Sequence, residues 1–183
     1  MDKCAVYIDA GYLASLLKAI GEPRIDFRKL SDVLCQGSDR LRTYYYTCMP
    51  HQSNPPTVDE KLRYSKTDKF IHQLKMIPRF EVRLGRLQKI GNGTTAEFTQ
   101  KGVDVMLAVD LVKMSWDKQI QKAIVLTADS DFVYAVQAAK DAGVVTQLYY
   151  SEDLALNKSL FDVFDERSPF TKDMVNNCKY VAV

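Results

Sequence analysis

One stretch, residues 123–132, constrains the fold of this chain more than any other. It reads AIVLTADSDF, and its apolar, β-branched start is typical of a strand that is buried on both faces. Apolar residues at helical spacing follow over residues 132–140 and predict a helix. Asp129 and Asp131 therefore lie in a strand-to-helix turn, at the carboxyl end of a parallel strand. Open α/β sheets bind their ligands at that edge.

The two carboxylates of this turn repel each other unless a positive group lies between them. A divalent metal ion is the simplest candidate for that group. The alternative is that Asp129 or Ser130 only caps the following helix. Capping explains one acidic residue well and leaves the second without a role.

The composition limits the classes of protein to which the chain can belong. Its 183 residues are 46% hydrophobic and 26% charged, as in ordinary soluble proteins, and we expect a single domain over residues 1–183. The net charge of +2 means that nucleic-acid binding would depend on a local basic patch. No apolar stretch approaches the roughly 20 residues of a membrane span, and the start lacks the layout of a signal peptide. We therefore expect a cytoplasmic protein.

The cysteines and histidines argue against a zinc site. The four cysteines are scattered without a C-x-x-C pair and are expected to be free, buried thiols. The chain has only two histidines to offer as further zinc ligands. A metal in this protein would thus be a hard ion that oxygen ligands hold. The residues concerned are Cys4, Cys35, Cys48, Cys178, His51 and His72.

Predicted strands and helices alternate along the chain, and this implies a mainly parallel sheet with helices on both faces, a three-layer α/β/α fold. The expected strands are 5–8, 41–48, 80–84, 123–126 and 144–149. The expected helices are 12–20, 26–34, 58–76, 103–116, 132–140 and 151–164, the last with Ser151 as its N-cap. Glycines at 91 and 93 predict a hairpin-like insertion near residues 87–98, whereas the tail, 165–183, fits no single element.

Acidic residues from three parts of the chain are expected at one edge of this sheet. Asp9 ends the first strand, and Asp104 lies in the first turn of the helix over 103–116. Strand ends and the starts of the following helices share an edge, so Asp129 and Asp131 can meet them there. Asp104 alone is explained by the helix dipole, but the set is more specific. The chain has no G-x-S-x-G elbow and no glycine-rich phosphate loop.

Three segments resemble the motifs of a known family. Residues 7–13 (YIDAGYL), 101–110 (KGVDVMLAVD) and 126–132 (LTADSDF) look like the motifs of the NYN domain, in the LabA-like (DUF88) branch of the PIN-like nuclease superfamily. The resemblance runs from the first strand to about Phe164. It implies a PIN-like, Rossmann-like α/β/α fold and a Mg²⁺- or Mn²⁺-dependent acidic site that acts on RNA. Position by position, the catalytic and metal-binding acids of the family match Asp9, Asp104, Asp129 and Asp131.

Other positions match the family less closely. Asp162 in the D-V-F of residues 162–164 resembles a closing D-x-F motif, with a solvated helix surface as the alternative. Ala10 and Ala128 replace frequent glycines, and Tyr12 stands where asparagine is common, which would alter substrate contacts. The hydroxyls of Thr127 and Ser130 either orient the carboxylates or are ordinary turn residues.

The leading hypothesis for the function is a metal-dependent endoribonuclease. The bound ions would activate water and stabilise the leaving oxygen, and Asp129 or Asp131 would orient or deprotonate the water. The first alternative is a non-catalytic RNA-binding or regulatory module that keeps the fold. The second, a phosphatase with an aspartyl-phosphate intermediate, needs another aspartate two residues after Asp9, where Gly11 stands.

Basic residues are the candidates for contacting the RNA, which we expect to be single-stranded. Lys101 precedes the helix over 103–116 and could meet a phosphate, and a basic face would track the backbone. Such faces are often only solvated. An exposed edge at the third or fifth strand would allow two copies to pair, so a homodimer stays open. The face consists of Lys61, Arg63, Lys66, Lys69, Arg83 and Arg86.

Overall fold

A seven-stranded sheet forms the centre of the protein. The computed structural model describes residues 1–90 and 97–180, without the side chains of 88–90 and 97–101. The strand order is β4-β3-β2-β1-β5-β6-β7, and all neighbours are parallel except β3 and β4. The strands are β1 (Lys3–Asp9), β2 (Asp39–Cys48), β3 (Phe80–Ile90), β4 (Glu97–Lys101), β5 (Lys122–Leu126), β6 (Val145–Tyr150) and β7 (Glu166–Pro169).

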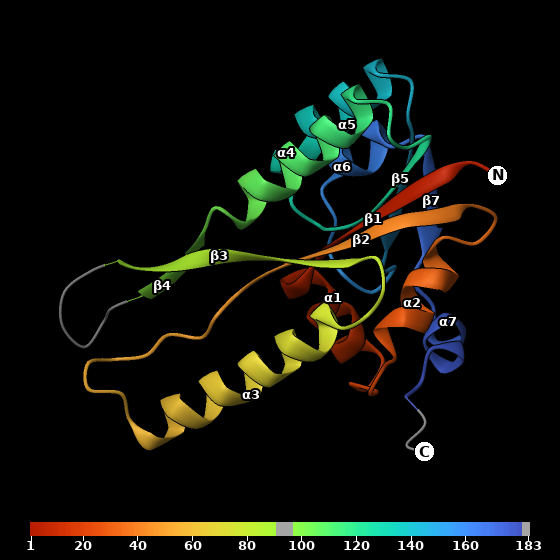
Figure 1. The fold of residues 1–183 in the computed structure, drawn as a ribbon. Coiled ribbons are helices and arrows are strands. Elements are labelled where there is room, and N and C mark those ends of the chain that lie inside the picture. The colour runs from red at the N-terminus through yellow and green to blue at the C-terminus, as the bar shows by residue number, and fades with distance from the viewer. Residues whose placement is uncertain (91–96, 181–183) are drawn as a thin grey trace.

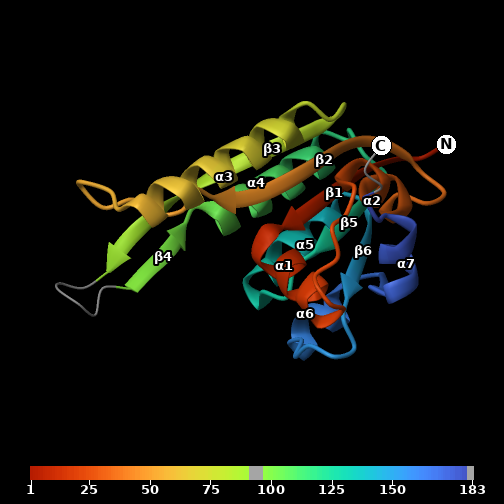
Figure 2. The same ribbon diagram turned by 90° about the horizontal axis from the view of Figure 1, so that it is seen from below.

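Helices cover both faces of the sheet (Figures 1 and 2). One face carries α4, α5 and α6, and the other carries α1, α2, α3 and α7. This arrangement confirms the three-layer α/β/α fold that the alternation of elements predicted. The helices are α1 (Ala10–Ala19), α2 (Phe27–Leu34), α3 (Val58–Lys75), α4 (Val103–Trp116), α5 (Val133–Asp141), α6 (Lys158–Val163) and α7 (Lys172–Asn177).

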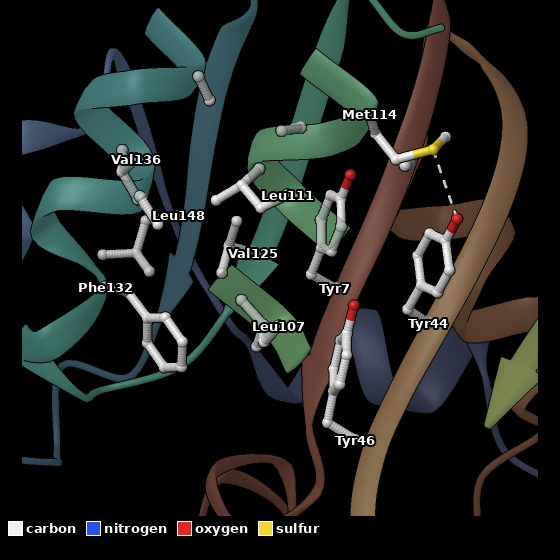
Figure 3. Packing of buried hydrophobic residues seen from close by; sticks show 14 of the residues in the cluster. Tyr7, Tyr44, Tyr46, Leu107, Leu111, Met114, Val125, Phe132, Val136 and Leu148 are labelled. Carbon is white, nitrogen blue, oxygen red and sulfur yellow. Dashed lines mark hydrogen bonds between the residues drawn. The ribbon is translucent and has the colours of Figure 1, made fainter. Parts of the chain in front are cut away.

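Each face of the sheet has its own hydrophobic core. On the α4 side, Tyr7, Tyr44 and Tyr46 lie side by side on β1 and β2 and pack against Leu107 and Leu111 (Figure 3). Alternate residues of a strand point to opposite faces, and the next tyrosine of β2 accordingly packs with Phe27 and Phe80 on the other side. All three tyrosines of residues 44–46 are thus buried in the packing of the sheet.

Most predicted elements agree with the structure to within a few residues, and the helix over 103–116 has the predicted bounds. The four cysteines are free and buried, as predicted, and the sulfurs of Cys4 and Cys35 lie 2.6 Å apart in a thiol hydrogen bond. Among the helices of residues 1–90 and 97–180, none has both the length and the apolarity that a membrane crossing requires.

The helix predicted over 151–164 is wrong in its first half. Helix α6 begins only at Lys158, where the Asn157 side chain accepts from the amide of Ser159 at 2.8 Å. Ser151 instead lies in a turn, in which its hydroxyl accepts from the amide of Asp153 at 3.1 Å. The Ser151 amide donates to the hydroxyl of Tyr12, far away in the sequence. This distant contact, invisible in the local pattern, holds the segment as a loop.

The tail contains a strand and a helix that the sequence pattern did not reveal. Strand β7 pairs with β6, so the predicted open edge at the fifth strand is wrong. Asp165, just before β7, accepts 2.9 Å hydrogen bonds from both the amide and the hydroxyl of Thr146 on β6. At the other end of the sheet, β4 pairs with residues 86–90 of β3. The predicted turn of this hairpin, 91–93, lies outside the described residues.

Candidate active site

The four acidic residues of the motifs lie at the edge where the parallel strands end. Asp9 is the last residue of β1, and its neighbouring strand β5 ends three residues before Asp129. Asp131 lies in the single turn of 3₁₀ helix that follows, η2 (Ser130–Phe132). Asp104 is the second residue of α4. The sheet topology thus brings residues from three distant parts of the chain to one place.

Asp9 is held in a fixed orientation by its neighbours. Its Oδ1 accepts from the amides of Gly11 at 2.9 Å and Tyr12 at 3.3 Å, so Asp9 is the N-cap of α1. Its Oδ2 accepts a long hydrogen bond of 3.5 Å from the hydroxyl of Thr127. Burial raises the pKa of the half-buried Asp9 carboxyl; the three hydrogen bonds oppose that shift, and the charge of Asp129 adds to it.

Asp129 is tied to the same hydroxyl. Its amide donates to Thr127 Oγ1 at 3.2 Å, and its Oδ1 accepts from the amide of Asp131 at 2.9 Å. Asp129 therefore does cap the next turn, as the alternative reading proposed. Within the described residues the Ser130 hydroxyl has no hydrogen-bond partner, whereas that of Thr127 links both acids.

The four carboxylates act on each other electrostatically. Burial raises the pKa of Asp104, and the charges of Asp129, Asp9 and Asp131 raise it further. None of the four forms an ion pair with a lysine or arginine in the described part of the chain. A cluster of carboxylate oxygens without a neighbouring cation has the donor chemistry that Mg²⁺ and Mn²⁺ prefer.

The arrangement is not a preformed cage for an ion. Over residues 1–90 and 97–180, no three His, Cys, Asp or Glu side chains are grouped so that they could hold a metal. Carboxylates that repel one another settle apart, and one oxygen of Asp9 and one of Asp129 are held by backbone amides. Of the four acids, Asp104 and Asp131 are the exposed ones.

The sequence model of the NYN domain matches residues 3–169. The chain belongs to the NYN domain family. NYN domains are generally nucleases of the PIN-like kind, and such nucleases typically use divalent metal ions. A solved structure of a protein of unknown function, VPA0982 from Vibrio parahaemolyticus RIMD 2210633, is similar over 94% of both chains, with a TM-score of 0.66 and 19% sequence identity. At that identity the likeness shows the fold alone. No curated protein matches the chain significantly.

The side chains of two further motif residues form no hydrogen bond with the acids in the described part of this NYN domain, although the Tyr12 amide donates to Asp9. Tyr12 is buried on α1, and its hydroxyl accepts from the Ser151 amide at 3.3 Å. It therefore fixes the loop after β6 and does not present its ring to solvent. Asp162 is exposed on α6, and its side chain has no hydrogen bond within the described residues, which matches the solvated reading.

The basic candidates fall into separate groups. Arg83 donates from Nε to Asp110 at 2.9 Å, and its guanidinium lies 5.3 Å from the ring centre of Tyr44, so it is bound in the interface between α4 and the sheet. Lys101 ends β4, and its side chain is outside the described part. The remaining five are exposed and form no ion pair with any described residue: Lys61, Arg63, Lys66, Lys69 and Arg86.

The sequence interpretation missed Asp110, the partner of Arg83. Asp110 also accepts from the hydroxyl of the fully buried Tyr46 at 3.0 Å. These contacts fix α4, and with it Asp104, against the sheet. An acidic residue inside the strongly apolar segment 103–116 was the available signal, because a carboxylate is seldom buried without a partner.

Proposed function

We propose that this NYN domain, in the LabA-like (DUF88) branch, is a metal-dependent endoribonuclease that hydrolyses phosphodiester bonds of single-stranded RNA. The proposal rests on the position of Asp9, Asp104, Asp129 and Asp131 at the edge where the parallel strands end, without an ion pair to any described lysine or arginine. RNA is a substrate that the nuclease family suggests. Four free, buried thiols fit the reducing cytoplasm in which we propose that the enzyme works.

The same four acids would hold the metal ion. Bound Mg²⁺ or Mn²⁺ supplies a Lewis acid that lowers the pKa of water and stabilises charge on the leaving oxygen. Asp9 and Asp129 are the fixed ligands in this scheme, because backbone amides already orient their carboxylates. Asp104 and Asp131, whose side chains are exposed, would complete the ligand set.

The proton of the attacking water needs an acceptor that is not fully committed to metal. Asp131 is the best placed, because its exposed carboxylate accepts no hydrogen bond from the described residues. Asp129 is less free, since its Oδ1 accepts from an amide. Thr127 keeps Asp9 and Asp129 in a constant relation during the reaction, as outer partners of metal ligands generally do.

The proposal is tested by cleavage of a labelled single-stranded RNA with Mn²⁺. Asp129→Asn removes a ligand charge at nearly constant volume and is expected to abolish cleavage, as is a chelator. Asp173→Asn, at an exposed acid on α7, controls for the general loss of a negative charge and should cleave as the wild type does. Cleavage that survives Asp129→Asn or the chelator would contradict the mechanism.

A non-catalytic RNA-binding module is the second candidate. It is favoured by one observation, namely that no metal-binding group of three side chains is preformed in the described residues. In that case the acids would act only as caps, as Asp9 and Asp129 do. Tight RNA binding without turnover in Mg²⁺, Mn²⁺ or another divalent ion would decide for this candidate.

A further inference from the structure

The face of β3 that points to α3 becomes steadily more open along the strand. Phe80 is 6% exposed, Val82 is half-buried, Leu84 is 40% exposed and Arg86 is exposed. These are alternate residues and share one face, and the first two pack in the core on the α3 side. The strand therefore loses its cover toward its carboxyl end.

Helix α3 shows a matching change along one stripe of residues, of which Leu74 packs in the same core as Phe80 and Val82. Leu74 and Ile71 are 2% and 3% exposed, Thr67 is half-buried, and Tyr64 reaches 36%. These positions are three or four residues apart and form one stripe. The helix is thus anchored by its last turns, while its first half stands away from the sheet.

Side-chain exposure increases toward the same end of the domain along both α3 and β3. Residues 76–79 connect the end of α3 to the start of β3, so the two elements are antiparallel. Together they project from the body of the domain in two perpendicular views (Figures 1 and 2). The space between them opens toward the edge at which the parallel strands end, and this is the edge that carries the acids.

The open end of this space is basic and apolar. Next to this space, on an adjoining face of α3, a hollow of about 560 Å³ is lined by Asp59, Leu62, Arg63 and Lys66, and Leu62 is 61% exposed there. Arg63, Lys66 and Arg86 form no ion pair with any described residue. By contrast, each arginine at the opposite end of the sheet is paired with an acid: Arg40 with Asp32, Arg42 with Glu81 and Arg79 with Asp39.

We propose that this space, the α3–β3 cleft, binds a single strand of RNA and leads it to the acidic site. Unpaired cations at its mouth would contact phosphates. Exposed side chains that face the cleft, Tyr64 and Leu84, would contact the faces of bases. Base faces are accessible only in unpaired RNA, because a duplex stacks them inside. The identity of the ligand rests on the proposed function; the cleft itself does not.

The cleft extends the site well beyond the acids. Strand β3 makes its last pair with β2 at Gly85, opposite Cys48, and continues through Ile90. Five further residues correspond to about 17 Å of strand. The cleft would accordingly contact several nucleotides of a bound RNA on one side of the scissile bond. This predicts that RNA substrates truncated on that side bind with lower affinity.

The test measures RNA binding separately from cleavage. Fluorescence anisotropy of a short labelled oligouridylate is followed with the Asp129→Asn protein in EDTA, over a series of salt concentrations. The double substitution Arg63→Ala, Arg86→Ala is expected to weaken binding and to reduce the slope of log affinity against log salt by about 1.4, since each single-strand phosphate contact contributes about 0.7. Lys75→Ala, at an exposed lysine near the closed end of the cleft, should leave both unchanged.

A second pair of variants tests the base contacts. Tyr64→Ala is expected to weaken binding of the oligouridylate at least about 5-fold, because a stacked base contributes about 1–3 kcal/mol. Tyr64→Phe keeps the ring and should bind as the parent does. Thermal unfolding checks that each variant is folded. Wild-type affinity in both the arginine double variant and Tyr64→Ala, or equal affinity for a duplex of the same length, would overturn the proposal.

The outcomes separate this inference from the proposed function. If the wild type cleaves RNA and the cleft variants change neither affinity nor KM, the cleft inference fails and the nuclease stands. If the cleft variants lose binding while the wild type cleaves nothing in any divalent metal, the nuclease proposal fails and the cleft stands.

Discussion

The hydroxyl of Thr127 donates to Asp9 Oδ2 at 3.5 Å and joins the ends of two adjacent strands, β1 and β5. The same oxygen accepts from the amide of Asp129. Thr127 is fully buried, so its position is set by the core and not by solvent. One short side chain thus fixes the relation between two of the four acids.

Removing this hydroxyl should leave the carboxylates of Asp9 and Asp129 less firmly oriented without abolishing metal binding. Thr127→Val keeps the shape of the side chain and is expected to lower both Mn²⁺ affinity and the cleavage rate about 10-fold or more, as partners of metal ligands usually do. KM for RNA should not change, because Thr127 is too deeply buried to touch it. Thr127→Ser keeps the hydroxyl donor and should retain most of the Mn²⁺ affinity and of the cleavage rate. If Thr127→Ser and Thr127→Val lose affinity and rate equally, the positioning role is contradicted.

Two buried tyrosines on neighbouring strands should respond oppositely to loss of their hydroxyls. The Tyr7 hydroxyl is buried and has no hydrogen-bond partner among the described residues, whereas that of Tyr46 donates to Asp110. Tyr7→Phe should stabilise the fold by about 1 kcal/mol or more, since an unsatisfied buried hydroxyl is costly. Tyr46→Phe should destabilise it by about 1.5–3 kcal/mol, because it removes a hydrogen bond to a charged acceptor. Urea unfolding measures the change in the free energy of unfolding for each variant. Changes of the same sign would contradict the different hydrogen-bonding states of the two hydroxyls.

The contact between Asp165 and Thr146 should make the stability depend on pH. Burial raises the pKa of Asp165, but the two hydrogen bonds from Thr146 and the ammonium of Lys140 outweigh it and hold the pKa below the ordinary value. A carboxyl with a lowered folded pKa stabilises the fold above its unfolded pKa, about 3.9 for aspartate. That contribution is lost as the pH falls through the folded pKa.

The variant Asp165→Asn isolates this effect. Its urea midpoint should lie below that of the wild type at neutral pH, and the gap should narrow below about pH 4. Asp173→Asn, at an exposed acid of the following helix, serves as the matched control and should show no gap. If the difference in urea midpoint between Asp165→Asn and the wild type stays constant down to acid pH, the ionised carboxylate is not its cause.

The sequence allowed prediction of those parts of the fold that are governed by local apolar patterns. The apolar run at 123–126 and the apolar pattern at 103–116 correspond to an observed strand and helix, and they place three of the four acids. Strand β7 was missed because its residues, ERSP, are polar and mostly exposed. It is held by pairing with β6 and by the Asp165 contact, both of which depend on the folded chain.

The basic residues could not be sorted from the sequence for a similar reason. Arg83 and Arg86 are an odd number of residues apart on one strand and therefore point to opposite faces of the sheet, but the strand was predicted to end at residue 84, before Arg86. Arg83 meets Asp110 on α4, and Arg86 faces the open cleft without a partner in the described chain. A strand extended beyond its neighbours and a helix that leaves the sheet are properties of the packing, and no local pattern reports them.

The central claim is that the four acids share a metal ion, and a crystal structure of the protein soaked in Mn²⁺ tests it most directly. Anomalous scattering should locate one or two ions at the edge formed by β1 and β5, with oxygen atoms of Asp9, Asp104, Asp129 and Asp131 as ligands. Rotation of the Asp104 and Asp131 side chains toward the ion is expected. An edge without anomalous density at a saturating Mn²⁺ concentration would contradict the account.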